Sequence, residues 1–374
     1  MVTVVIFLIV LAVLIFVHEL GHFLLAKAFG IRVGAFKIGF GPKIFAWTPT
    51  KKDGTRGETE YGVNMIPFGG YVKIFGENPD DDEKTTFLAS TPAFVKSEKT
   101  RSLAHKSRWK QVIVLAGGVF FNVLFAWVLY AGLFSHGVTA TADGFSNYTK
   151  YFSDERIMVT DVVKGSPADS AGLEIGDTLI GNSISDIQNN ILGSKGSQVD
   201  IAYSRDGVVQ DAKVVPTKSI VADKYAIGIA MNDVADMKLP FFTAIYEGGH
   251  YTIEIFQQTV VGLYDFVVQI FHGTANFADI SGPVGIAGIV GDAARLGMTY
   301  LLMITALISI NLAVINLIPF PALDGGRILF VIIESIIRRP IPAKFTNWVN
   351  LVGFGLLMLL MVVVTYKDIV KLVQ

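Results

Sequence analysis

The chain has 374 residues, of which 52% are hydrophobic and 17% charged. This composition is too apolar for an ordinary soluble protein and is typical of a membrane protein that carries some aqueous mass. The formal net charge of -1 gives no indication of a nucleic-acid partner, and the lack of cysteine excludes disulfides, thiolate zinc sites and a cysteine nucleophile. Any metal ion must therefore be bound by His, Asp or Glu.

Four apolar stretches are long enough to cross a bilayer as helices, which takes about 20 residues. We expect these spans at about residues 4–28, 112–134, 299–318 and 348–366, the last within a segment 345–368. A cleaved signal peptide is the alternative for the first stretch. However, no Lys or Arg precedes Lys27 and bulky residues follow the apolar run, so we expect a retained helix in segment 1–30.

Basic residues near the ends of the spans predict the orientation, because cytoplasmic loops collect Lys and Arg. They lie between the first and second spans and again between the third and fourth: Lys27, Arg32, Arg101, Lys106, Arg108, Lys110, Arg327, Arg338, Arg339 and Lys344. Both loops are therefore expected in the cytoplasm, and both termini and the region 135–297 outside. The cytoplasmic half of the first helix then contains His18 and His22.

The two segments that follow the first span, residues 31–76 and 77–111, lack its continuous hydrophobic run. Residues 31–76 contain short β-prone runs interrupted by Gly and Pro, such as "KIGFGPK" and "IPFGGYVK", which predicts hairpins. Since these runs are apolar and adjoin a span, we expect a sheet that enters the membrane against protein or a water-filled cavity. Segment 77–111 is expected to be a cytoplasmic connection.

The region 140–235 alternates short strands with turns around "KGSPADSAGLEIGDTL". It resembles the PDZ domains of bacterial envelope proteases, although any small β-rich domain remains the alternative. A PDZ domain would bind an extended peptide at a sheet edge or act as a size filter at the active-site entrance. We expect segment 236–298 to be an amphipathic helix at the outer surface, in which His250 and His272 are packing residues.

The first span contains three ionisable residues in the sequence "HELGH". His18 and His22 are four residues apart, so both imidazoles lie on one face of the helix and can bind one metal ion. Glu19 is offset around the helix, where it can act as a general base toward water. Ionisable residues inside a membrane are functional candidates by default, which makes a chance match a weak alternative.

Catalytic zinc takes three protein ligands, so a third residue is needed. Asp324 is the candidate, at the end of segment 299–330, where Pro319 and Pro321 interrupt the helix in "NLIPFPALDGGR". The alternative for Asp324 is a cap at the start of the following helix, and the two roles do not exclude each other. If Asp324 is the ligand, the first and third spans must meet.

These paired motifs resemble the site-2 protease family of intramembrane zinc metalloproteases, and the order of segments resembles its bacterial regulator-of-sigma-E (RseP type) branch. The likeness covers essentially the whole chain, with one PDZ domain where the best-known member of the branch has two. It implies one zinc ion on His18, His22 and Asp324, and Glu19 as the residue that activates water. It also implies substrate contacts, which it assigns to Asn311, Asn316, Gly39 and Gly41; Asn122 matches a polar position that we expect to be structural.

The sequence thus predicts a polytopic α-helical membrane protein with four transmembrane helices, a membrane re-entrant β-hairpin region and an inserted extracytoplasmic β-rich PDZ domain. The resemblance implies a bacterial inner-membrane protease that cleaves single-pass membrane proteins, such as anti-sigma factors or remnant signal peptides. Two rivals from other classes are a catalytically silent membrane scaffold that uses its PDZ domain and a metal-ion transporter. Neither rival accounts for Glu19.

Overall fold

The computed structural model describes residues 2–50, 57–77, 99–141, 148–205, 207–218, 224–275 and 281–373. Most of segment 77–111, expected to be a cytoplasmic connection, lies outside the described residues. The chain forms two compact units, which are residues 1–130 with 246–374 and residues 131–245. Each unit is described by itself below.

Four described helices are long and apolar enough to cross a membrane, in agreement with the four predicted spans. They are α1 (Val2–Ala28), α5 (Gly117–His136), α10 (Met298–Leu317) and α12 (Ala343–Val373). The second span begins later than predicted, because residues from Arg108 to Leu115 form the separate helix α4. The third ends at Leu317, and α11 (Asp324–Ile337) follows after a short non-helical link.

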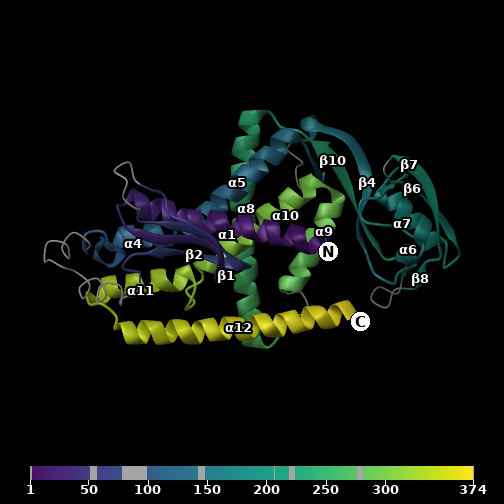
Figure 1. Ribbon diagram of the computed structural model, residues 1–374. Helices are drawn as coiled ribbons and strands as arrows, with labels where there is room; N and C mark the ends of the chain where they lie inside the picture. Colours follow the sequence, from purple (N-terminus) through teal and green to yellow (C-terminus); the bar gives the residue numbers. More distant parts are fainter. Residues whose placement is uncertain are drawn as a thin grey trace. The chain divides into compact units, whose positions relative to one another are not determined.

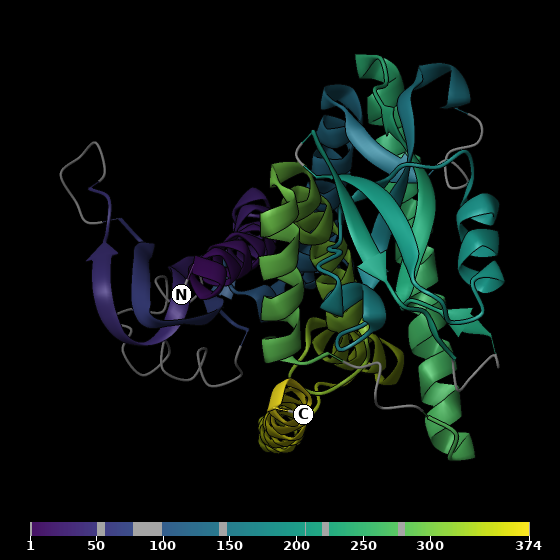
Figure 2. The same cartoon turned by 90° about the vertical axis from the view of Figure 1, so that its right-hand side faces the viewer.

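The axes of α1 and α12 are nearly parallel, with the two chains running in opposite senses, whereas α8 (Phe241–His272) lies across them, as both ribbon views show (Figures 1 and 2). If α1 and α12 cross the membrane, α8 lies parallel to its plane. That direction fits the surface helix predicted for segment 236–298, which also contains α9 (Pro283–Leu296). Its depth in the membrane stays a prediction.

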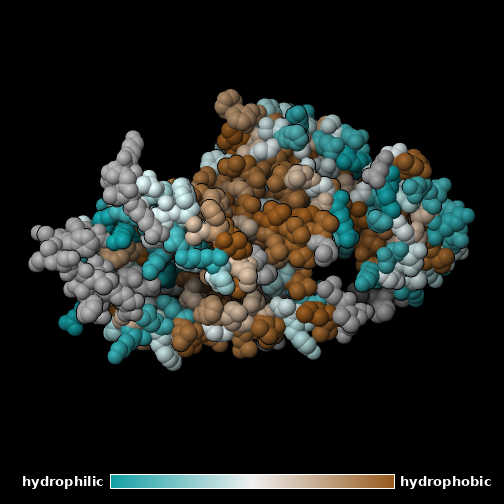
Figure 3. All heavy atoms as spheres, viewed as in Figure 1, coloured by the Kyte–Doolittle hydropathy of each residue, from teal (hydrophilic) through white to brown (hydrophobic). Residues whose placement is uncertain are grey.

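Large apolar side chains are exposed along the candidate spans. Val5 and Ile9 of α1 and Leu351 and Leu359 of α12 are each more than half exposed. The space-filling view shows hydrophobic surface gathered over the helical part of the chain (Figure 3). A surface of this kind is costly in water and suits contact with lipid, so the helical unit is that of an integral membrane protein.

The strands β1 (Val33–Trp47) and β2 (Glu60–Ile74) form a hairpin that folds back on itself. The register pairs Phe36 both with Val72 and with Tyr61, so the first half of β1 lies between the two halves of β2. Its buried end packs with α1 and α4 around Ile31, Val33 and Ile74. The hairpin itself agrees with the strands expected in segment 31–76, while its entry into the membrane stays a prediction.

The unit 131–245 contains a six-stranded sheet with the strand order β3-β10-β4-β5-β6-β7. The strands are β3 (Val138–Thr141), β4 (Phe152–Val162), β5 (Thr178–Leu179), β6 (Val199–Arg205), β7 (Val208–Val214) and β10 (Ile229–Met237). The short helices α6 (Pro167–Ser170) and α7 (Ile184–Gly193) and the small pair β8 (Thr217–Lys218) and β9 (Tyr225–Ala226) complete the unit. Its core gathers around Val159, Leu173 and Val214. This unit is the β-rich domain expected for 140–235, and its assignment as a PDZ domain stays a prediction.

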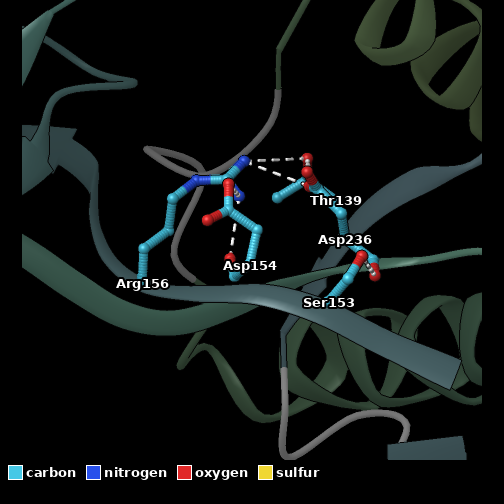
Figure 4. Close-up of polar contacts among 5 residues, drawn as sticks. All are labelled: Thr139, Ser153, Asp154, Arg156 and Asp236. Atoms are coloured by element: carbon cyan, nitrogen blue, oxygen red, sulfur yellow. Dashed lines mark hydrogen bonds and ion pairs between the residues drawn. The ribbon is translucent and has the colours of Figure 1, made fainter. Parts of the chain in front are cut away.

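Polar side chains join three strands of this sheet at one end. Arg156 of β4 donates to Asp154 on its own strand, to Thr139 of β3 and to Asp236 of β10 (Figure 4). Ser153 also donates to the backbone carbonyl of Asp236, at 3.2 Å. The guanidinium therefore connects the three strands where the pairing of β4 with β10 shifts register between Val234 and Asp236.

Candidate metal centre

The two histidines of α1 lie one helical turn apart and face Asp324 at the start of α11. Their Nε2 atoms are 3.3 Å apart, and Asp324 Oδ2 lies 3.1 Å from His18 Nε2 and 3.3 Å from His22 Nε2. Among the described residues, these three form the one group of His, Asp or Glu close enough to share a metal ion. The structure thus brings together the three ligands predicted from two distant motifs.

The arrangement of these three residues fits a zinc ion. Asp324 Oδ2 is buried and has no hydrogen-bond partner, although both imidazoles are close to it. A buried carboxylate oxygen without a hydrogen bond is costly unless a cation satisfies it. Two imidazole nitrogens and one carboxylate oxygen form a three-ligand donor set of the kind that catalytic zinc uses.

The alternative role for Asp324, a helix cap, is wrong in this structure. The residue at the N-cap position of α11 is Leu323, and no side chain caps the helix there. Asp324 is instead the first helical residue, and its carboxylate points to the histidines rather than to the free backbone N–H groups of its own helix.

The link before α11 directs Asp324 toward α1. Ala322 has a positive φ of 73°, and its backbone N–H donates to Asn350 Oδ1 of α12. A Cβ atom on Gly325 or Gly326 would collide with backbone carbonyls of the link, so only glycine allows this tight return of the chain. The "GG" that follows Asp324 therefore serves the geometry of the metal centre.

Glycines also let α5 pass close to the two histidines. A Cβ atom on Gly117 would lie 2.8 Å from the carbonyl oxygen of Gly21, so α1 and α5 touch backbone to backbone. A Cβ atom on Gly118 would lie 2.6 Å from His18 Nε2 and would also collide with His22. Close helix contacts of this type depend on small residues. Val114 O of the preceding helix α4 lies 2.9 Å from His22 Nδ1, where it accepts that ring's proton.

Glu19 and the metal-binding candidates line one cavity of about 480 Å³. The same cavity is also lined by the last residues of β2, from Gly70 to Ile74, together with Glu77, Ala322 and Arg327. Glu77 accepts a hydrogen bond from Arg327. No other described strand pairs with the edge of residues 70–74 that β1 leaves open. The cavity thus combines a candidate base, a candidate metal site and a strand edge.

The other predicted site residues lie outside this cavity lining. Asn311 Oδ1 accepts a hydrogen bond from Thr259 of α8 at 3.2 Å, and Asn316 is partly buried near the end of α10. Gly39 and Gly41 have φ values of 84° and 81° and form the bend of β1. Substrate contact by these four residues stays a prediction.

The sequence predicted strands in segment 31–76 that could pair with a substrate backbone, but it did not single out the edge of residues 70–74. The residue that marks this edge is Gly70 in "FGGYV". A Cβ atom there would lie 2.8 Å from Ile15 Cγ2 and 3.3 Å from Glu19 Cγ. Glycine there lets the strand pass directly beside the helix that carries the motif. From sequence alone, the same glycine is equally consistent with a turn.

Comparison with known proteins agrees with this geometry. The sequence model of peptidase family M50 matches residues 6–360. The chain belongs to peptidase family M50. This is the family of the site-2 proteases, so the protein is a zinc metalloprotease embedded in a membrane, as the paired motifs predicted.

Relatives in this family match the chain over nearly its full length. A "Putative zinc metalloprotease" of Clostridium perfringens is 37% identical over 96% of this chain and 95% of its own. A protein of the same description from Clostridium acetobutylicum is 32% identical over 96% and 94%. The zinc metalloprotease RasP of Oceanobacillus iheyensis is 30% identical over 100% of both chains.

Proposed function

We propose that this M50 peptidase cleaves single-pass membrane proteins at a peptide bond inside the membrane. The observation that carries the proposal is the cluster of His18, His22 and Asp324 between apolar helices, with Glu19 in the wall of the same cavity. A transporter needs ionisable groups along a path, whereas these groups converge on one point beside a candidate base. The cluster is the set of groups that hydrolysis requires.

One zinc ion would be held by His18 Nε2, His22 Nε2 and a carboxylate oxygen of Asp324. When bound, zinc supplies Lewis acidity, which activates a water molecule and polarises a carbonyl group. Glu19 takes the proton of the attacking water and delivers it to the amine that leaves when the peptide bond breaks. The carboxylate of Glu19 is free for this task because it is not one of the three ligands.

The open edge of β2 would bind the substrate backbone. A transmembrane helix hides its carbonyl groups in internal hydrogen bonds, so it must unwind before a peptide bond can react. An extended segment that adds to the edge of residues 70–74 would exchange those hydrogen bonds for a strand ladder beside Glu19. Asn311 and Asn316 would contact the substrate backbone near the reacting bond, and the loop that contains Gly39 and Gly41 would help to hold the substrate extended.

The remaining parts of the proposal concern topology and substrates. Both termini and the β-rich unit would lie outside the cytoplasmic membrane of a bacterium, with the metal centre toward the cytoplasmic side. The substrates would be proteins already shortened outside the cell, such as anti-sigma factors or remnant signal peptides. The β-rich unit, as a PDZ domain, would bind a peptide or exclude bulky substrates.

The test combines zinc content with cleavage of a single-span substrate by the purified protein. Glu19→Gln should keep about one zinc ion and lose about 100- to 10,000-fold in cleavage rate, the usual contribution of a general base. Glu254→Gln, on the exposed side of α8, is the matched control and should cleave normally. If wild type binds zinc but cleaves none of several single-span substrates, the scaffold alternative replaces the proposal. A wild type without zinc would overturn the metal assignment itself.

A further inference from the structure

Asn122 of α5 is a buried polar residue that the chemistry above does not use. Its side chain is fully buried, and its carboxamide lies 3.2 Å from His18 Nδ1. The backbone carbonyl of the same residue accepts a hydrogen bond from Ser309 Oγ of α10 at 2.8 Å. Asn122 is therefore fixed between α1 and α10, in direct contact with a candidate zinc ligand.

The orientation of the Asn122 carboxamide determines which ring nitrogen of His18 carries the proton. With Nδ2 toward His18, the amide donates, His18 Nδ1 accepts, and the imidazole proton must sit on Nε2. That proton would occupy the nitrogen that faces Asp324 and His22, and it would prevent metal binding there. In the same orientation Asn122 Oδ1 is buried without any hydrogen-bond partner.

A half-turn of the carboxamide exchanges its oxygen and nitrogen, which brings Oδ1 to His18 and moves Nδ2 to the position that Oδ1 left. Oδ1 then accepts the proton of His18 Nδ1, so the orphaned oxygen is satisfied and the lone pair of His18 Nε2 becomes free. The second histidine already has this arrangement, because Val114 O lies 2.9 Å from His22 Nδ1. Zinc-binding histidines generally donate their other ring N–H to a carbonyl or carboxylate, which fixes the tautomer and the ring orientation.

We propose that Asn122 is a positioning residue that accepts the Nδ1 proton of His18 through Oδ1 and so prepares Nε2 for zinc. One backbone carbonyl serves His22, one side-chain amide serves His18, and both come from the segment where α4 and α5 pass α1. The hydroxyl of Ser309 holds the backbone of α5 at this level. The proposal rests on the zinc site of the proposed function.

The test measures zinc affinity of the whole protein in detergent, by competition with a coloured chelator. Asn122→Leu removes the acceptor at similar volume and should weaken zinc binding about 10- to 100-fold, the usual cost of losing such a partner. Asn122→Asp keeps an acceptor and should stay within about threefold of wild type. The matched control is Thr305→Val, which removes a buried hydroxyl of α10 that bonds only within its own helix.

Replacing zinc with cobalt tests the environment of the metal directly. The absorption of cobalt would not change if Asn122 served only to pack the helices. The visible absorption of the cobalt protein should change in Asn122→Leu and remain as in wild type for Asn122→Asp and Thr305→Val. The melting temperature of the zinc-free protein reports folding, and Asn122→Ala replaces Asn122→Leu if the latter does not fold.

Two results overturn the proposal: unchanged zinc affinity in Asn122→Leu or Asn122→Ala, or an equal loss in Asn122→Asp. Absence of zinc from wild type would instead overturn the proposed function, so the two failures are distinguishable.

Discussion

The two units of the chain differ in whether all their buried side-chain polar atoms have hydrogen-bond partners. In the helical unit, buried side-chain atoms of Asn64, Ser102, Asn122 and Asp324 have no hydrogen-bond partner. In the unit 131–245, Asp177 is 1% exposed but accepts from Arg205 Nε at 2.7 Å and from Arg205 Nη2 and the Glu174 backbone at 2.8 Å. No described residue of that unit has an orphaned buried side-chain atom.

The presence or absence of a hydrogen-bond partner distinguishes buried polar groups that stabilise the fold from those that can bind a ligand. An unpaired buried polar atom costs about 1–3 kcal/mol, so a chain that keeps one beside two imidazoles indicates a cation. A paired carboxylate such as Asp177 indicates a structural role. Asn64 Oδ1 and Ser102 Oγ are orphaned as well, and nothing in the structure explains them.

The strongest test of this comparison removes the orphaned carboxylate. Asp324→Ala deletes one of three ligands, and we expect zinc affinity to fall by more than about 100-fold, since even an indirect partner costs 10- to 100-fold. Cleavage should be lost with the metal. Hydrogen exchange of the unit 131–245 should stay as in wild type, and zinc retention at wild-type affinity would contradict the ligand assignment.

The converse test removes the partner of the satisfied carboxylate. Arg205→Met leaves Asp177 buried without its guanidinium, which should destabilise the unit by about 3 kcal/mol. This corresponds to about 100-fold faster hydrogen exchange in β5 and β6 of the intact protein, measured by mass spectrometry. Zinc affinity should not change. Lys213→Met, an exposed charge on β7, is the control, and equal exchange in both variants would show that Asp177 does not depend on its ion pair.

A smaller effect is expected from adding one methyl group beside the imidazoles. Gly118→Ala overfills the contact of α5 with His18 and His22, and overpacking of this kind costs about 1–3 kcal/mol, or about 5- to 150-fold in zinc affinity. Gly132→Ala in the same helix meets no atom within 4 Å and should leave zinc binding unchanged. Equal affinities in the two variants would mean that α5 can shift away from α1 without cost.

The smallest effect concerns pH and the partly exposed Asp236. Burial raises the pKa of this carboxyl, but the hydrogen bonds from Arg156 and Thr139 and the Arg156 charge outweigh it and hold the pKa below its usual value. The stabilisation is therefore present above the unfolded pKa of about 4 and is lost as pH falls through the folded pKa.

Comparison of wild type with Asp236→Asn tests this sign. We expect a difference below about 1 kcal/mol at pH 7, because the side chain is exposed to salt and water, and it should shrink as pH falls below 4. Hydrogen exchange of β10, corrected for the intrinsic rate at each pH, measures it. A difference that grows on acidification would contradict the lowered pKa.

The sequence predicted the features that depend on local pattern. Four apolar runs gave four helices, and the spacing of His18 and His22 placed both rings on one face. The link between Pro319 and Asp324 was also predicted, because proline cannot continue a helix. These signals require no knowledge of which segments meet.

Features that depend on long-range packing were not predictable. The return of β2 along both sides of β1 has no local signal, since an alternating pattern does not specify a partner. The break between α4 and α5 at Ala116 interrupts an apolar run whose composition is continuous. The contact of Asn122 with His18 likewise becomes visible only when the helices are assembled.

The identity of the residue at position 118 also distinguishes homologous sequences from one another. The space that the hydrogen of Gly118 leaves is filled by the rings of His18 and His22, so any larger residue there competes with them. A homologue that retains both histidines, the glutamate and the aspartate, but carries a bulky residue aligned with Gly118, is expected to have become a pseudoenzyme. One position without any functional group can thus sort working peptidases from silent descendants before a protein is purified.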